Sequence, residues 1–149
     1  MLKALRRLAA FCLCISLSLG LITPANVNAA GLKPADLAVI RRQAAAYDAT
    51  KARLPELARL GSAEDWTFTR NLIHGPMQEV GREMLYINQR LLPGDRKEAN
   101  KLADALKTAL AELDEAARLQ EGSRLTKEYS RVASGFGAYA EMIPADALS

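Results

Sequence analysis

His74 is the one histidine of this 149-residue chain, and its imidazole is the side chain best suited to ligate a metal or transfer a proton. A di-iron carboxylate site in a helical bundle needs two Glu-x-x-His motifs, but Asn71 stands three residues before His74. A catalytic triad needs a serine or cysteine nucleophile with an orienting acid, and no elbow motif surrounds this histidine. We expect His74 to hydrogen-bond locally or to contact a partner; with Gln78 it is a weak candidate for a surface metal ligand.

Other motifs for catalysis and cofactor binding are missing from the sequence. No Cys-x-x-Cys-His segment could attach haem, and Gly135-Phe136-Gly137 is too short for a dinucleotide loop and follows no predicted strand. A calcium site would need oxygen ligands that converge from a loop. The acidic residues near the end of the third predicted helix instead favour a solvated face; they are Glu112, Asp114, Glu115 and Glu121. We predict a protein that is not an enzyme, with no cofactor, no metal and no small-molecule substrate.

Three arginines lie on the second predicted helix, away from its apolar positions: Arg70, Arg82 and Arg90. The simplest interpretation is a solvated face. The alternative is a docking surface for an acidic partner, and such exposed contacts would be sensitive to salt. Together with His74, these arginines are our candidate partner-binding residues.

The first 29 residues have the layout of a secretory signal peptide. Lys3, Arg6 and Arg7 precede an apolar stretch over about residues 8–22, which is too short and wrongly flanked for a transmembrane helix. Val27-Asn28-Ala29 fits the small-x-small cleavage pattern. We therefore expect an exported protein whose mature chain forms a single domain over residues 30–149.

Removal of this segment would change the charge and the cysteine content. The full chain has 20 basic and 17 acidic residues; three of the basic residues lie in the leader, so the mature chain has 17 of each and no net charge. This balance argues against a nucleic-acid partner. Both cysteines, Cys12 and Cys14, lie in the apolar stretch and neither follows a small residue, so we expect neither disulfides nor a lipid anchor. We favour the ordinary secretory route over twin-arginine export.

Apolar residues recur at spacings of three, four and seven in four segments, which predicts four amphipathic helices. The expected helices span about residues 34–53 with one more turn at 56–60, 63–91, 95–121 and 123–143. Short turns between long helices predict an all-α, antiparallel, up-down-up-down four-helix bundle. Its core should consist mostly of Leu and Ala, with aromatic residues from the second and fourth helices. Pro76, after Gly75, should kink or break the second helix because it cannot donate a backbone hydrogen bond.

Several segments resemble the PsbQ-like proteins of photosystem II, especially their cyanobacterial form. They are Trp66-Thr67-Phe68-Thr69-Arg70-Asn71-Leu72-Ile73-His74-Gly75-Pro76, Leu91-Leu92-Pro93, Leu113-Asp114-Glu115-Ala116-Ala117 and the run from Phe136 to Pro144. The resemblance extends from about Leu37 to Pro144. It implies a four-helix bundle in the thylakoid lumen, peripheral to the membrane, that contacts the lumenal loops of the photosystem II core and other extrinsic subunits.

The same resemblance implies a non-catalytic subunit that stabilises the oxygen-evolving complex and helps it to retain calcium and chloride. The alternative is an unrelated exported helical bundle that binds metal or acts as a holdase.

We predict that the mature protein begins at Ala30 and carries no lipid, because the cleavage pattern ends at Ala29 and the cysteines lack a lipobox. Intact-mass measurement on protein from its native host tests this. A lipid-modified cysteine at the N-terminus would contradict the prediction.

Overall fold

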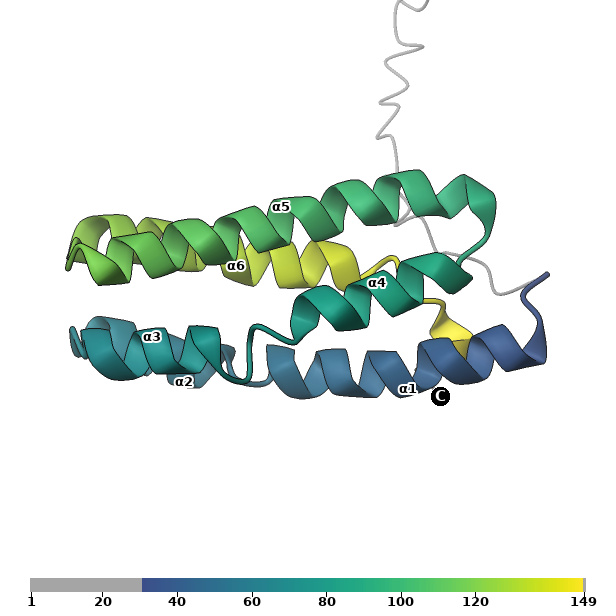
Figure 1. The fold of residues 1–149 in the computed structure, drawn as a ribbon, viewed down its shortest axis with the longest axis horizontal. Helices are drawn as coiled ribbons and strands as arrows, with labels where there is room; N and C mark the ends of the chain where they lie inside the picture. The colour runs from purple at the N-terminus through teal and green to yellow at the C-terminus, as the bar shows by residue number, and fades with distance from the viewer. Residues whose placement is uncertain (1–30, 149) are drawn as a thin grey trace, which may run out of the picture.

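The computed structural model describes residues 31–148, so the predicted leader and its cleavage point lie outside the described residues. Six α-helices and one 3₁₀ helix make up its regular structure, and residues 31–148 contain no strand, which confirms the all-α prediction (Figure 1). The elements are α1 (Pro34–Lys51), α2 (Leu54–Ser62), α3 (Trp66–His74), α4 (Val80–Arg90), α5 (Pro93–Arg118), α6 (Gly122–Ala140) and η1 (Ala145–Ala147).

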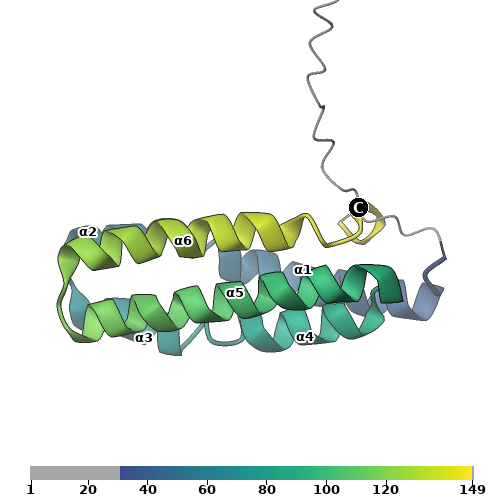
Figure 2. The same ribbon diagram turned by 90° about the horizontal axis from the view of Figure 1, so that it is seen from above.

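The six helices are arranged as four rods that lie side by side in an elongated molecule. α1 continues into α2 along one rod and α3 continues into α4 along another, while α5 and α6 each form a rod of their own (Figures 1 and 2). α5 packs along α6, and α4 packs along α1. At the other end of the molecule, α2 packs against α6 and α3 packs against α5. This arrangement is consistent with a four-helix bundle.

The break in the second rod lies where the Gly75-Pro76 pair predicted a kink or break. α3 ends at His74 and α4 begins at Val80, so the single helix expected over 63–91 is wrong in its extent. A Cβ atom on Gly75 would lie 2.9 Å from the backbone oxygen of Asn71, so a larger residue would clash there. The turn keeps Met77 fully buried, so the apolar stripe continues across the break.

The other helix ends differ from expectation by a few residues. Asp65 caps α3 by accepting a hydrogen bond from the backbone N–H of Phe68 at 3.3 Å. Ser62, three residues before this cap, is the last residue of α2. α5 starts directly at Pro93, where a missing N–H costs no intrahelical hydrogen bond. Such differences arise because the end of a helix depends on where the chain turns. The packing of the neighbouring rods decides that point.

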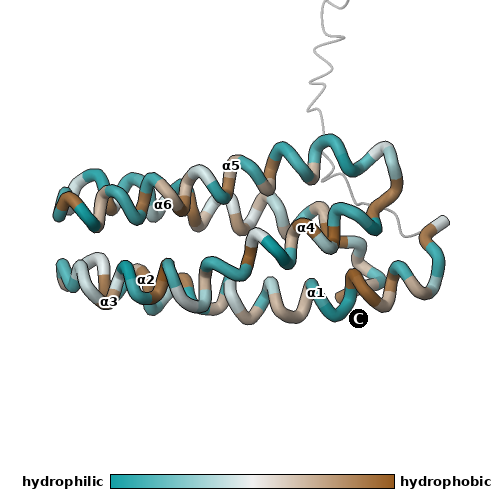
Figure 3. The backbone as a smooth tube through the Cα atoms, in the orientation of Figure 1, coloured by the Kyte–Doolittle hydropathy of each residue, from teal (hydrophilic) through white to brown (hydrophobic). Residues whose placement is uncertain are grey.

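The predicted apolar stripes form the core. Hydrophobic residues recur along each helix with hydrophilic residues between them (Figure 3). Nearly every stripe position is buried, and the others are partly buried and packed against the core: Leu37, Trp66, Leu102 and Tyr129. The fully buried aromatic residues Phe136 and Tyr139 come from α6, the fourth predicted helix, as expected. The third, Tyr47, comes from α1 and not from the second predicted helix, whose Trp66 is only partly buried.

An aromatic cluster joins α1 to α6. The ring centroid of Tyr47 lies 5.5 Å from that of Phe136 and 5.2 Å from that of Tyr139. The Tyr47 hydroxyl donates to the backbone oxygen of Phe136 at 2.7 Å. Burial raises the pKa of both tyrosine hydroxyls above the ordinary value, so both remain protonated donors.

A chain of polar side chains connects this cluster to α4 and α5. The Tyr139 hydroxyl lies 2.6 Å from Oδ1 of Asn88, and Nδ2 of Asn88 donates to Oδ1 of Asn100 at 2.8 Å. Each member has a partner, so burial of these polar groups leaves no hydrogen bond unmade along the chain. The hydrogen bonds therefore align three helices with one another.

Glu83 is a buried carboxyl group on α4. Its Oε2 lies 3.4 Å from Oγ1 of Thr50 on α1, and its nearby arginine, Arg82, pairs instead with Glu79. Burial raises the pKa of Glu83, and the Thr50 contact only partly offsets that effect.

We predict that Phe136→Ala lowers the free energy of unfolding by about 3–5 kcal/mol, the usual cost of truncating a buried Phe. Phe136 is fully buried and contacts Tyr47, so the substitution removes the ring from the centre of the bundle. Urea denaturation followed by circular dichroism measures the change. A loss below about 0.5 kcal/mol, typical of surface substitutions, would show that the site repacks freely.

We predict that Glu83→Gln raises the free energy of unfolding at pH 7. A carboxyl whose pKa is raised by folding binds its proton more tightly in the folded state than in the unfolded state. Its contribution to the free energy of unfolding is therefore favourable below the unfolded pKa and is lost as the pH rises through the folded pKa. The advantage of the variant should therefore vanish below pH 4.5, the ordinary value. Urea denaturation at a series of pH values measures this. The exposed Glu141→Gln is the control, and an equal effect there would contradict the explanation.

Candidate functional site

Asp114 joins two of the predicted partner-binding residues. Its Oδ1 lies 3.0 Å from Nε of Arg70 and 2.9 Å from Nε2 of His74. Arg70 and His74 sit one turn apart on α3, whereas Asp114 belongs to α5, so the contacts connect two rods. His74 is thus paired with a carboxylate on another rod, and not with a group close to it in the sequence.

The solvated face predicted for the acidic residues of α5 is wrong for Asp114. Its side chain is only 19% exposed because Arg70 and His74 cover it. The other three acids form ion pairs on or near the same helix end: Glu115 with Arg118, and Glu112 and Glu121 with Arg124. Hydrogen bonding from Arg118 lowers the pKa of Glu115. No spacing rule links residues 70 and 114, so no pattern in the sequence predicts this pair.

The two remaining candidate arginines lie on α4 and pair separately. Nη1 of Arg90 is 3.2 Å from Oδ1 of Asp36 on α1, which connects these two rods. Arg82 pairs with Glu79 at the start of its own helix and is the most exposed of the three arginines, at 65% of its side chain. The three arginines therefore do not share one acidic partner within the molecule, and each is already paired.

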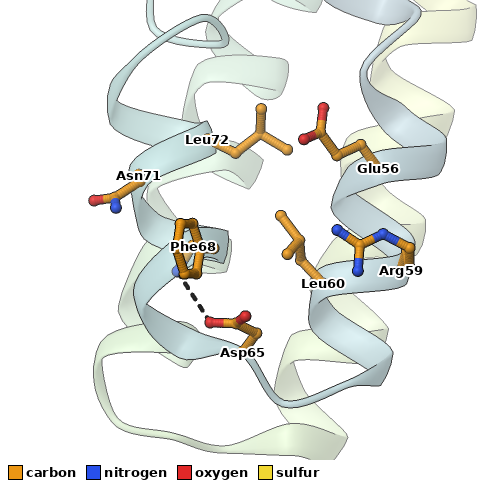
Figure 4. Close-up of a pocket in the computed structure, with 7 residues that line it drawn as sticks. All are labelled: Glu56, Arg59, Leu60, Asp65, Phe68, Asn71 and Leu72. Carbon is orange, nitrogen blue, oxygen red and sulfur yellow. Dashed lines mark hydrogen bonds between the residues drawn. The ribbon is translucent and has the colours of Figure 1, made fainter.

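A groove on the outer face of α2 and α3 lies near this region. It is lined by Glu56, Arg59, Leu60, Asp65, Phe68, Asn71 and Leu72 (Figure 4). The ring of Phe68 stands at its edge and is 61% exposed, although the sequence places it in an otherwise apolar-periodic segment. None of the predicted site residues lines this groove, so sequence reasoning missed it.

Apolar side chains also reach the surface on α4. Leu85 and Tyr86 are 51% and 42% exposed, and they lie on the same helix as Arg82. Exposed aromatic residues and arginines are enriched at protein–protein interfaces. Their position next to the candidate arginine makes this side of α4 a reasonable contact surface.

No group of three or more His, Cys, Asp or Glu residues within 31–148 is placed to hold a metal ion, and this includes the surroundings of His74. None of the helices in that range combines the length and the apolar character needed to cross a bilayer.

The fold and these surfaces define a class: an all-α protein built as four packed rods, with paired charges and a few exposed apolar side chains on its surface. Comparison with known proteins then identifies its family. The model of the PsbQ family, described as oxygen evolving enhancer protein 3, matches residues 22–144, which is well over half of the chain. The chain belongs to the PsbQ family, so the resemblance seen in the sequence is confirmed.

A characterised relative supports the same assignment. The chain is 32% identical to CyanoQ of Synechocystis sp. over 101 residues. The aligned part covers 68% of this chain and 66% of CyanoQ, just under two thirds of that relative's length. Membership of this family argues against the alternative of an unrelated exported bundle.

We predict that Asp114→Asn destabilises the protein by about 1 kcal/mol or less, because the pairs it forms are partly exposed and screened by solvent. The loss should shrink as salt is added. Thermal or urea denaturation at low and high salt measures it. Asp104→Asn is the control: Asp104 pairs with Lys107 on the same helix and is 72% exposed, so it should change stability little. Equal losses of stability in the two variants would show that the ion pairs between α3 and α5 stabilise the protein no more than an exposed pair within one helix.

Proposed function

We propose that this protein is a non-catalytic extrinsic subunit of photosystem II on the lumenal side of the thylakoid membrane. Membership of the PsbQ family is the observation that carries the proposal. The similarity to CyanoQ and the predicted secretory leader support it, because export would deliver the chain to the lumen. Its partners would be the lumenal loops of the photosystem core and other extrinsic subunits.

The protein stabilises the oxygen-evolving complex through contact and helps it to retain calcium and chloride. No group of three or more His, Cys, Asp or Glu residues among the described residues is placed to hold a metal ion, and this supports a mechanism based on shielding and positioning. A mature chain without net charge would not be attracted to its partner over long distances, so attraction must come from local contacts.

The directions in which the four rods run are part of the same proposal. We infer an antiparallel up-down-up-down bundle, because short turns connect rods that pack along one another: residues 63–65, 91–92 and 119–121. Such a bundle is a rigid, elongated body that can span the gap between neighbouring subunits without changing shape.

Arg82 is the best of the predicted partner-binding residues for docking. Arg70 and Arg90 both hold pairs between rods, with Asp114 and Asp36, so a partner would have to replace stabilising contacts. Arg82 pairs only with Glu79 in its own first turn, and Leu85 and Tyr86 are exposed beside it. A partner carboxylate can therefore bind Arg82 without loosening the bundle.

We predict that reversing the charge at Arg82, as in Arg82→Glu, weakens rebinding to photosystem II that has been depleted of the protein. One exposed pair contributes about 0.2–1 kcal/mol, so affinity should fall by up to about fivefold. Reversing Arg70, Arg82 and Arg90 together should weaken rebinding further and flatten its salt dependence. Rebinding, and oxygen evolution at limiting calcium or chloride, are the measurements.

Arg53→Glu is the matched control, because Arg53 also forms an exposed pair with an acid three residues away, Glu56, but lies at the start of α2. Circular dichroism must remain unchanged in both single variants. If Arg82→Glu rebinds like the wild type, docking uses another face. If the wild type neither copurifies with photosystem II nor changes its activity, the proposed function is wrong.

A further inference from the structure

An open groove runs between α5 and α6 on the surface of the bundle. The two helices lie side by side and pack along one another (Figure 2). The groove has a volume of about 510 Å³, and most of its lining residues are exposed. It is lined by Ala105 and Ala109 of α5 and by Lys127, Ser130, Arg131, Ser134 and Gly135 of α6.

Small side chains form the floor of the groove. Ala109 is buried, so its methyl group closes the bottom. A Cβ atom on Gly135 would lie 3.1 Å from Cδ1 of Leu106, so the glycine allows α6 to lie close to α5. The floor is therefore fixed by the packing of the two helices, and the side chains of a partner can enter without displacing a large residue.

The rim of the groove on α6 is positively charged. α6 contains three basic residues and one acid, Glu128, and that acid is buried. Lys127 has no ion-pair partner within residues 31–148. Nη1 of Arg131 pairs with Glu128 at 2.8 Å, but 52% of the arginine side chain stays exposed. Because a guanidinium has five N–H donors, most of those of Arg131 remain for a partner.

Acidic residues beside the groove do not cancel this charge. Glu98 and Glu112 stand seven residues before and after Ala105, so they share its face of α5. Both are already paired, Glu98 with Lys101 at 3.2 Å and Glu112 with Arg124 at 2.6 Å. The charge of the rim therefore complements a partner that carries carboxylates.

The spacing of the two cations indicates the shape of that partner. Lys127 and Arg131 are four residues apart, which places their Cβ atoms about 5–6 Å apart on one face of α6. A helix with two acids four residues apart presents its carboxylates at the same spacing. The other side chains of such a helix form a ridge that packs into the groove between two helices. A floor of alanine and glycine lets the partner helix approach to the ordinary packing distance of about 8–10 Å between axes.

We propose that the groove between α5 and α6 is a second contact surface, which binds an acidic amphipathic helix of a partner protein. The carboxylates of that helix pair with Lys127 and Arg131, and its small or apolar side chains contact Ala105 and Ala109. The surface is separate from the proposed docking surface around Arg82, because Arg82 lies on α4 and the groove is lined by α5 and α6.

The probe is an alanine-based peptide longer than about 15 residues, since shorter isolated helices are marginal in water. It carries glutamates four residues apart on one face, and the control peptide has glutamines at the same positions. Each peptide is titrated into the purified protein and followed by amide NMR. The glutamate peptide should shift the amides of Ala109 and Gly135 and bind more weakly as salt is added. The glutamine peptide should bind between about twofold and thirtyfold more weakly, as expected for two exposed ion pairs.

Two variants with matched controls test the charge and the shape of the groove. Lys127→Gln should weaken the glutamate peptide by up to about fivefold. Lys97→Gln is its control, because Lys97 is also exposed and unpaired within residues 31–148 but lies outside the groove. Ala105→Leu fills the groove and should abolish binding. Ala111→Leu, at an exposed position of the same helix outside the groove, should bind like the wild type.

Absence of binding of the glutamate peptide to the wild type at millimolar concentration would overturn the proposal. So would equal affinity for the two peptides, equal losses in Lys127→Gln and Lys97→Gln, or binding that survives Ala105→Leu. Vesicles of phosphatidylcholine with phosphatidylglycerol test a competing occupant. If Ala105→Leu lowers the affinity for these vesicles but not for the glutamate peptide, the groove binds an anionic lipid surface and the proposal is wrong. None of these outcomes bears on binding to photosystem II.

Discussion

The packing of Tyr47 against Phe136 and Tyr139 is the interaction on which the rest of the bundle depends. α1 is rich in alanine and buries few large side chains, so Tyr47 supplies much of the apolar area that holds this helix in place. The ring can be fully buried only because its hydroxyl has an acceptor, the backbone oxygen of Phe136. One residue thus combines burial with a directional bond and fixes α1 relative to α6.

The polar chain that starts at Tyr139 extends the same constraint to the other two rods. A leucine can slide along an apolar neighbour at little cost, but a buried amide must meet its partner at hydrogen-bond distance. Asn88 therefore aligns α4 with α6, and its bond to Asn100 aligns α4 with α5. This requirement determines how the rods are positioned along their length, which a core of Leu and Ala alone would leave poorly defined.

The two ends of the molecule differ in how well their polar groups are satisfied. The end formed by α1 and α4 contains the aromatic cluster and its hydrogen bonds, whereas the end formed by α2 and α3 contains the buried Thr69 hydroxyl, which has no hydrogen-bond partner. On the surface, arginines such as Arg70 and Arg90 already serve the bundle by joining rods. A partner protein therefore has fewer free charges to bind than the sequence suggested, and exposed apolar residues become correspondingly more important for contact.

The sequence by itself determined the helical class, the apolar stripes, the break at Gly75-Pro76 and the family. These follow from local rules: periodicity decides which face is buried, and a proline without an N–H interrupts a helix when it stands beyond the first turn. The tertiary structure alone decided which polar residues meet. Asp114 with Arg70, Asn88 with Asn100 and Tyr47 with the Phe136 carbonyl are separated along the chain by 44, 12 and 89 residues. Their pairing depends on how whole rods are positioned, and no spacing within one helix encodes it.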